Sequence, residues 1–328
     1  MMRLRKRLEL LTKTSTIGAR VLWRRYRHGP RQPSWDLRYE MMVEFFSGVL
    51  SGRSELSERR SSFDAMGARE LGRGRVDVRS VTVGMRAAEW ITPPGAATDS
   101  AILYLHGGAY ALGSPSSHRV SMANLALATG LRLLVLDYRL APEHPCPAAI
   151  EDGLAAYEWL LDNGLAPERV VIAGDSAGGG LSLSVTLGLR ERGVALPAGL
   201  VLLSPWTDLS RDGELQREDT GLDYIGPKGI GKVARAYYGQ LDPKDPRVSP
   251  AYGDFTGFPP MLIIAGGQEY LLADSERLAE RARAHGVATV LHVEPEQVHV
   301  YPFFHPVHPA ASVGIGRVAE FVRARLEG

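Results

Sequence analysis

The sequence predicts an α/β protein, built on one mostly parallel eight-stranded sheet with helices on both faces. Short apolar runs rich in β-branched residues alternate with stretches of helical spacing, and this alternation is typical of parallel sheets. Gly and Pro residues bound most of the runs, as expected of strands that end in turns. The predicted strands are residues 75–83, 85–91, 101–105, 131–136, 170–173, 200–203, 261–264 and 289–293.

The first two predicted strands flank Gly84 and are expected to form an antiparallel pair at the edge of the sheet. Helical spacing recurs near residues 120–128, 148–161, 274–285 and 313–326, and in the alanine- and leucine-rich stretch after residue 176. Residues 208 to about 258 break this rhythm, because they are rich in charge, Gly and Pro with one helical piece near 233–238. An insertion this long between strands is usually functional.

The composition excludes several classes of protein. With 45% hydrophobic and 23% charged residues, the 328-residue chain has the composition of a globular protein. Its formal net charge of +1 gives no overall positive potential that would attract nucleic acid. Cys146 is the only cysteine, so no intramolecular disulfide can form. The sequence has no zinc-binding pattern, phosphate loop or membrane-spanning apolar run. We therefore expect a cytoplasmic protein without a metal ion, cofactor or nucleic-acid partner.

Residues 1–70 are predicted to form a basic arm and a cap helix, and residues 71–328 a catalytic domain with a cap insertion near 208–250. Within residues 1–31, Glu9 is the only acidic residue among many arginines and lysines. Two interpretations remain open. The arm either lies as a helix on an anionic membrane surface, so that the protein is peripheral to the membrane, or is a solvated segment, the commoner fate of a charge run.

Residues 35–68 predict one amphipathic helix followed by a loop. The apolar stripe of this helix is either core packing or the wall of a substrate pocket. Its members are Trp35, Leu37, Met41, Met42, Phe45, Phe46 and Leu50.

A candidate nucleophile lies at Ser176, between an apolar strand and a helical stretch. In the Gly174-x-Ser176-x-Gly178 pattern, glycines two residues before and after the serine remove clashes at a strained strand–turn–helix elbow. The Ser176 hydroxyl would then stand at the carboxyl end of a parallel strand, where such sheets bind ligands. The five residues alone also fit a plain glycine-rich turn, so partners elsewhere in the chain must decide between the two interpretations.

A serine nucleophile needs a base and an acid that orients the base, and after such an elbow the chain order is serine, acid, histidine. His299 follows the last strand by a short loop, which is the expected place of the base. The other histidines after Ser176 lie in less suitable places: His285, His292, His305 and His308. For the acid, Glu269 lies in the loop after strand 261–264, whereas Asp274 also fits the N-cap or first turn of the next helix.

The oxyanion of an acyl-transfer reaction needs backbone donors from two places. The amide of Ala177, after the nucleophile, is one. The glycines of His106-Gly107-Gly108, after strand 101–105, are the other, because glycine lets the backbone approach the substrate closely. We expect His106 itself to hold this loop by hydrogen bonding.

Taken together, these motifs resemble the bacterial hormone-sensitive-lipase-like esterases (family IV carboxylesterases) of the α/β-hydrolase superfamily. The resemblance covers residues 75 to 325. It rests on Leu105-His106-Gly107-Gly108-Ala109-Tyr110, Asp137-Tyr138-Arg139-Leu140-Ala141-Pro142-Glu143-His144-Pro145, Gly174-Asp175-Ser176-Ala177-Gly178-Gly179, Leu203-Ser204-Pro205-Trp206, Ser249-Pro250 and Val298-His299-Val300.

The resemblance implies an α/β-hydrolase fold with a helical cap made from the N-terminal segment and residues 208–250. It also implies cofactor-free hydrolysis of short- to medium-chain esters, often by a homodimer. Asp175 is implied to order the elbow. Two positions depart from the family pattern: Ala109 replaces a frequent third glycine, and Glu269-Tyr270-Leu271 occupies the place of a common Asp-Pro-Leu.

The sequence thus predicts a serine carboxylesterase with Ser176 as nucleophile, His299 as base and Glu269 as acid. Gly107, Gly108 and Ala177 are the predicted oxyanion donors. A lactonase, amidase or carbamate hydrolase with the same triad is an alternative, and so is a binding protein on this fold, although such proteins lack the histidine. Candidate pocket residues, which also fit cap packing, are Trp35, Met41, Met42, Phe45, Tyr110, Asp175, Trp206, Tyr224, Tyr237 and Tyr238.

Overall fold

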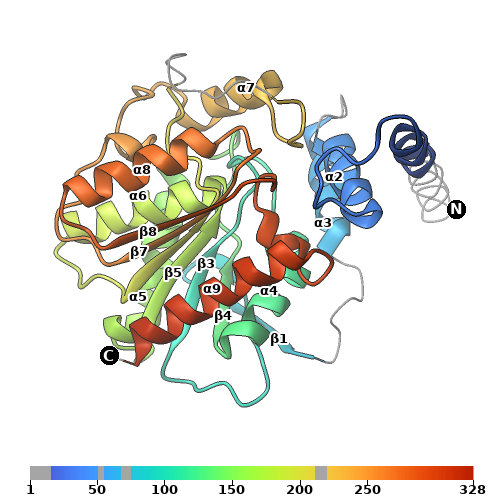
Figure 1. Cartoon of the computed structure of the whole chain (residues 1–328). Coiled ribbons are helices and arrows are strands. Elements are labelled where there is room, and N and C mark those ends of the chain that lie inside the picture. The colour runs from blue at the N-terminus through green and yellow to red at the C-terminus, as the bar shows by residue number, and fades with distance from the viewer. Residues whose placement is uncertain (1–15, 51–54, 68–74, 211–219, 328) are drawn as a thin grey trace, which may run out of the picture.

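The computed structural model describes residues 16–50, 55–67, 75–210 and 220–327. Its centre is an eight-stranded sheet in the order β1-β2-β4-β3-β5-β6-β7-β8 (Figure 1). The strands are β1 Asp77–Val83, β2 Arg86–Thr92, β3 Ala101–Leu105, β4 Arg132–Leu136, β5 Val170–Asp175, β6 Gly199–Leu203, β7 Met261–Gly266 and β8 Thr289–Glu294. Each lies where the sequence predicted a strand, so the predicted fold class is confirmed.

Pairing in the sheet is antiparallel only at its β1 edge. β1 pairs with β2 and β2 with β4 in antiparallel fashion, and the remaining pairs are parallel. The carboxyl ends of β3, β5, β6, β7 and β8 therefore meet at one edge, so the loops after these strands come together there. The residues of β3, β5, β6 and β7 are all buried, as expected for strands covered on both faces.

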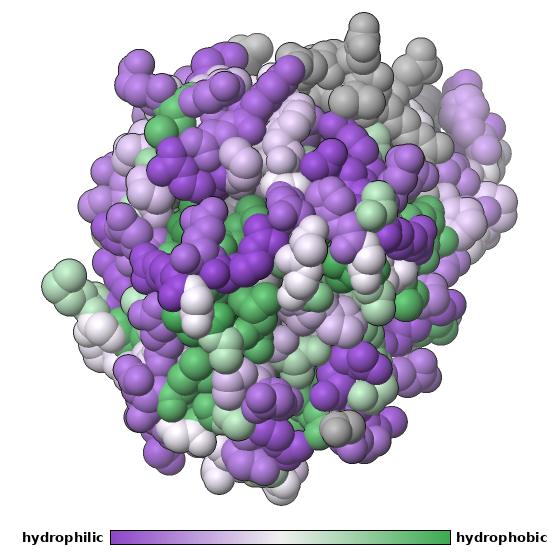
Figure 2. All heavy atoms as spheres, turned by 90° about the vertical axis from the view of Figure 1, so that its left-hand side faces the viewer, coloured by the Kyte–Doolittle hydropathy of each residue, from purple (hydrophilic) through white to green (hydrophobic). Residues whose placement is uncertain are grey.

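Two hydrophobic cores lie on the two faces of the sheet, since successive strand residues point to opposite sides. In β5, Val170 and Ile172 belong to one core, and Val171 and Ala173 to the other. The first core includes helices α5 (Ala148–Asp162), α6 (Ala177–Glu191) and α8 (Leu272–Ala284). The second includes α4 (Pro115–Thr129) and α9 (Pro309–Leu326). The outer surface on the side of α8 is mostly hydrophilic (Figure 2), as the outside of such a layered fold should be.

The described residues after 36 form α2 (Leu37–Leu50) and, from residue 56 on, a second helix, α3 (Leu56–Gly67), so the prediction of one helix and a loop is wrong. α3 has no apolar stripe in its sequence and is held by polar contacts. Arg60 donates to the carbonyl oxygens of Ala111 and Ala141, and Ser114 Oγ donates to Asp64 at 2.5 Å. These contacts fix α3 on the loop after β3, through Ala111 and Ser114, and on the loop after β4, through Ala141. The sequence of α3 predicts a solvent-exposed segment, because the residues that bind its polar side chains lie far along the chain.

Further helical residues lie at 16–28, before α2, and in α7 (Pro227–Tyr238), within the long insertion. The segment 220–226, which leads into α7, reaches the loop after β8, because Tyr224 donates its hydroxyl to the carbonyl of His299 at 2.6 Å. The predictions for residues 1–15 and 211–219 fall outside the described residues. Among the helices of the described ranges, none combines the length and the apolar character needed to cross a bilayer.

Candidate active site

Ser176 lies in the turn between β5 and α6 with a φ of 52° and a ψ of −121°. This backbone conformation is strained for a residue with a side chain. The turn is held from both sides: the Ser176 amide donates to the Leu203 carbonyl at 2.8 Å, and the Trp206 amide donates to the Ser176 carbonyl at 2.9 Å. A Cβ on Gly178 would lie 1.9 Å from the Leu105 carbonyl oxygen, so only glycine fits there. The turn has the predicted elbow geometry.

His299 lies in the loop after β8, and the structure brings it to Glu269. The His299 Nδ1 atom is 3.9 Å from Glu269 Oε2. Within the described part of the chain, the two ring nitrogens of His299 have no hydrogen-bond partner. The same is true of Glu269 Oε1. The three side chains are almost shielded from solvent, with exposed fractions of 7% for Ser176, 1% for His299 and 0% for Glu269. A small movement would turn the 3.9 Å contact into a hydrogen bond.

The other histidines that the sequence offered have different surroundings. They are His285 at the C-cap of α8, His292 beside Arg317, His305 beside Ser312, and His308, which caps α9.

Burial moves the pKa values of the base and the acid in opposite directions. It lowers the pKa of His299 to about 4 and raises that of Glu269 to about 8, because a charged form is disfavoured away from water. His299 is therefore neutral at physiological pH, which is the form that can accept a proton.

Asp274, the alternative acid, has a different task. Its Oδ2 atom accepts hydrogen bonds from the amides of Thr207 and Asp208 at 2.7 and 2.9 Å, which fixes the loop after β6. Leu271 is the N-cap of α8, so Asp274 does not cap its own helix. The geometry thus favours Glu269 as the acid.

Ser204 ties the acid to the base. Its hydroxyl donates to Glu269 Oε2 at 2.6 Å and accepts a hydrogen bond from the Val300 amide at 2.9 Å. Ser204 also has a positive φ of 48°. The motif Leu203-Ser204-Pro205-Trp206 marked this place in the sequence, but not the contact itself.

Asp223 was missed by the sequence reasoning. Its Oδ1 atom accepts the amides of Tyr224 and His299 at 2.8 and 3.2 Å, and its Oδ2 atom accepts the amide of Tyr270 at 2.9 Å. One carboxylate from the insertion thereby binds the backbone beside both Glu269 and His299. Burial of this carboxyl raises the pKa of Asp223 to about 7. No sequence signal distinguishes it within an insertion rich in charged residues.

The oxyanion donors need one correction. The Gly107 amide donates to Asp175 Oδ1 at 2.9 Å, so the prediction that it binds an oxyanion is wrong. The next residues, Gly108 and Ala109, have positive φ values of 121° and 54°. Among the described residues, neither the Gly108 amide nor the Ala109 amide donates a backbone hydrogen bond. Ala177 is the first residue of α6, where amides lack partners within the helix. These three amides are the available donors.

Asp175 does not line a pocket. Its Oδ1 atom accepts from the Tyr104 hydroxyl at 2.9 Å as well as from Gly107, and His118 Nε2 lies 3.5 Å away. The side chain is buried behind the loop after β3. It therefore fixes this loop to the elbow, and its prediction as a pocket residue is wrong.

Of the other predicted pocket residues, Tyr110 and Trp206 lie beside α6, the helix that follows Ser176. A Cβ on Gly180 would lie 2.9 Å from the Tyr110 hydroxyl and 2.2 Å from the Trp206 carbonyl oxygen. Tyr110 also stacks on Tyr237, with ring centroids 3.7 Å apart. The Tyr110 hydroxyl thus lies near the first turns after Ser176, and the Trp206 ring lies 6.1 Å from the Tyr110 ring.

Trp35 and Met41 pack against other parts of the protein and not against Ser176. The Trp35 indole donates to the Glu296 carbonyl at 2.7 Å, and Met41 lies against Gly18 of the N-terminal helix. Phe46, on the same helix as Met41, is connected to His299 through Tyr224. Its ring is 5.5 Å from that of Tyr224, which in turn is 6.0 Å from the His299 ring.

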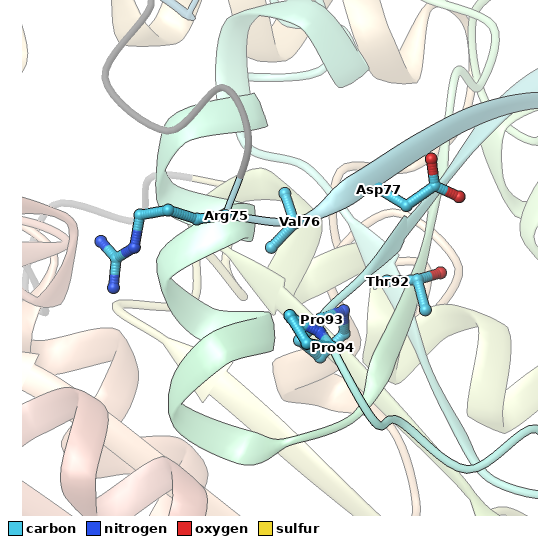
Figure 3. Close-up of a pocket in the computed structure, with 6 residues that line it drawn as sticks. All are labelled: Arg75, Val76, Asp77, Thr92, Pro93 and Pro94. Carbon is cyan, nitrogen blue, oxygen red and sulfur yellow. The ribbon is translucent and has the colours of Figure 1, made fainter.

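An open hollow at the other end of the sheet is not a second candidate. Figure 3 shows Val76, Asp77, Thr92 and the two following prolines around it, with the Arg75 side chain extending away from them. Because β2 is antiparallel to β4, the Thr92 end lies beside the amino end of β4, opposite the edge that carries Ser176. Its lining residues in the described part of the chain include a carboxylate, Asp77, and a hydroxyl, Thr92, but no histidine.

We predict that Gly107→Ala destabilises the protein by about 1–3 kcal/mol, since overpacking a tight site has that cost. A Cβ at position 107 would lie 2.1 Å from Asp175 Oδ2, a buried side chain held by its own hydrogen bonds. Thermal unfolding measures the change. Gly316→Ala is the matched control, because nothing lies within 4 Å of its added Cβ, and its stability should be unchanged or higher. Equal stability of the two variants would contradict the prediction.

Comparison with known proteins gives one family. The model of the family described as alpha/beta hydrolase fold matches residues 102–303. An acetyl-hydrolase of Streptomyces hygroscopicus is 42% identical over 245 residues, which cover 74% of this chain and 81% of that protein. An esterase of Acinetobacter venetianus is 34% identical over 248 residues, covering 75% and 82%.

Solved structures agree. A crystal structure of an esterase from the bacterial hormone-sensitive lipase family is 39% identical, with a TM-score of 0.83 over 87% of this chain and 96% of that chain. Another, of the hormone-sensitive lipase from a metagenome library, is 36% identical with a TM-score of 0.82, over 90% and 100%. The chain therefore belongs to the alpha/beta hydrolase family, in its branch of hormone-sensitive-lipase-like (family IV) esterases.

Proposed function

We propose that the protein is a serine carboxylesterase that hydrolyses short- to medium-chain carboxylic esters through an acyl-enzyme. The observation that carries the proposal is the meeting of three loops at one sheet edge. Ser176 follows β5, Glu269 follows β7 and His299 follows β8, with Glu269 and His299 3.9 Å apart. The names of the relatives, esterase and acetyl-hydrolase, support ester hydrolysis. The presence of His299 beside Glu269 supports an enzyme over a binding protein.

In the first half of the reaction, Ser176 Oγ attacks the ester carbonyl carbon while His299 takes the hydroxyl proton. Glu269 orients the imidazole and stabilises its cation. The oxyanion is bound by the amides of Gly108, Ala109 and Ala177. When the C–O bond to the alcohol breaks, His299 returns the proton to the leaving oxygen. The products of this half are the free alcohol and an ester on Ser176.

In the second half, a water molecule replaces the alcohol. His299 takes one of its protons as the oxygen attacks the acyl carbon, and the tetrahedral intermediate again binds the three amides. Collapse of this intermediate releases the carboxylic acid, and His299 returns the proton to Ser176 Oγ. A single backbone donor is worth about 10²–10³ in rate in such sites, so the loop after β3 contributes substantially to the rate.

The preference for short chains rests on how closed the site is. Ser176 is only 7% exposed, and the rings of Tyr110, Trp206 and Tyr237 occupy the space beside its helix. A long acyl chain would have to displace these packed aromatic side chains.

We predict that p-nitrophenyl acetate and butyrate are hydrolysed with kcat/KM at least about tenfold higher than the palmitate ester, as expected when a chain exceeds its pocket. A rate series over acyl length measures this. Ser176→Ala, run beside the native protein, should lose turnover of every ester. A maximum at palmitate would contradict the chain-length proposal, and undiminished turnover in Ser176→Ala would contradict the serine mechanism.

We predict that kcat/KM rises with pH and levels off above about 8. The active form needs neutral His299 and ionised Glu269. Since the pKa of His299 is about 4, it is already neutral, whereas Glu269 loses its proton only as the pH rises through about 8. Burial is the main cause of the raised Glu269 pKa, and the neighbouring Asp223 raises it further.

Asp223→Asn should therefore shift the rising part of the profile to lower pH. It should also lower kcat by about tenfold or more, because small displacements of a catalytic group are costly. Asp242→Asn is the control. Among the described hydrogen bonds, the Asp242 carboxylate accepts one from the Lys244 amide, in the loop after α7 and away from Glu269 and His299. If Asp223→Asn kept both the native profile and the native kcat, the positioning role of Asp223 would be refuted.

A further inference from the structure

The helical residues 16–28 carry an apolar stripe that faces away from the protein. Ala19, Leu22, Trp23 and Tyr26 recur at i, i+3, i+4 and i+7, which places them on one side of the helix. Leu22, Trp23 and Tyr26 are 53%, 59% and 89% exposed. Figure 1 shows this dark-blue helix at the outer edge of the molecule, beyond α2. A stripe of this kind would normally be buried, so its exposure calls for a partner.

The opposite side of the helix is anchored, so the stripe cannot turn inward. Val21 is fully buried, and Arg24 and Arg25 each bind the buried carboxylate of Glu40 at 2.8 Å. Arg24 binds Glu44 as well, at 2.7 Å. Rotating the helix would break these ion pairs and leave a carboxylate without its partners, which is costly in a buried place.

Positive charge is concentrated around this stripe. Arg20 and Arg27, seven residues apart, are exposed along one flank of the stripe, and the Arg27 guanidinium lies 5.2 Å from the centre of the Trp23 ring. In sequence, residues 1–31 contain ten Lys and Arg and one Glu, a net charge of +9. Because the whole chain has a net charge of +1, the remainder carries −8. An anionic surface would attract the arm and repel the rest of the protein.

We propose that helix 16–28 lies on an anionic lipid surface, with the stripe of Ala19, Leu22, Trp23 and Tyr26 in the headgroup region. Trp and Tyr are the side chains enriched at this boundary, and exposed arginines add attraction to lipid phosphates. The stripe is too short and the segment too charged to span the membrane, so the contact is peripheral.

The proposed contact would also bring the cap side of the molecule to the membrane. The helix is tied to α2 through Glu40, and Phe46 of α2 packs on Tyr224, which contacts His299. Apolar esters dissolve preferentially in a lipid phase. Membrane contact would thus raise the local concentration of substrate near the cap without changing the chemistry at Ser176.

Vesicle flotation of the full-length protein tests the proposal. The native protein should float with vesicles of phosphatidylcholine mixed with phosphatidylglycerol but not with phosphatidylcholine alone, and high salt should weaken binding. Arg27→Gln should lower the partition coefficient about fivefold, the usual effect of one surface cation. Removing both aromatic rings in Trp23→Ala/Tyr26→Ala should lower it by about tenfold or more.

Two exposed residues elsewhere provide matched controls. Met85 is 95% exposed in the turn between β1 and β2, and Arg79 is exposed on β1. Met85→Ala and Arg79→Gln should bind vesicles like the native protein. All four variants should hydrolyse a water-soluble ester at the native rate, which separates membrane binding from the proposed catalysis.

Three results would overturn the proposal. The first is a native protein that does not float with anionic vesicles. The second is undiminished flotation of the stripe variants. The third is a dimer of the native protein, seen by light scattering, that Trp23→Ala/Tyr26→Ala converts to a monomer without changing flotation, because the stripe would then be an interface between two copies of the chain.

Discussion

The strained turn at Ser176 is the constraint on which the rest of the site depends. Holding a serine at a φ of 52° costs about 1–3 kcal/mol, and such strain persists only where the surroundings enforce it. Here hydrogen bonds and close contacts of the backbone hold the strained turn in place. Leu203 and Trp206 bind the serine amide and carbonyl, and Gly178 lets the first turn of α6 approach the end of β3. The close contact places the loop after β3, with its open amides, beside the serine.

A second set of contacts joins the acid and base loops, and it consists of side chains that do no chemistry themselves. Ser204 connects Glu269 to the Val300 amide, and Asp223 connects the backbone of Tyr270 to that of His299. Both connections give buried polar groups hydrogen-bond partners within the protein, which holds the two loops in place. Asp223 comes from the insertion, so the insertion and the loops that carry Glu269 and His299 are joined by hydrogen bonds.

Much of the fold and part of the site follow from the sequence, for identifiable reasons. Most of the strands are apolar runs bounded by turns, and Ser176 has a glycine two residues before it and two after it, as a tight elbow needs. The chain order of such sites then leads to Glu269 and His299, which the structure brings close together. These features are local patterns or an order along the chain, and both can be read without coordinates.

The remaining features depend on contacts between distant residues. The Gly107 amide looked available because nothing in the sequence shows that Asp175, 68 residues later, accepts its hydrogen bond. Asp223 is one of several acidic residues in its insertion, and only folding selects it. The sequence predicts a loop where the polar helix α3 forms, because Arg60 finds its carbonyl partners 51 and 81 residues away. Hydrogen bonds between a side chain and a backbone group so far apart in sequence leave no periodic pattern from which they could be predicted.

The central claim is that Ser176 forms an acyl-enzyme, and the most direct test is to find the acyl group. The protein is mixed with p-nitrophenyl butyrate and quenched in acid within the first turnover, and its peptides are mapped by mass spectrometry. The account predicts that one butyryl group appears on the peptide containing Ser176 and is absent in Ser176→Ala. A butyryl group on another residue, or steady turnover with no acylated peptide at any time, would contradict it.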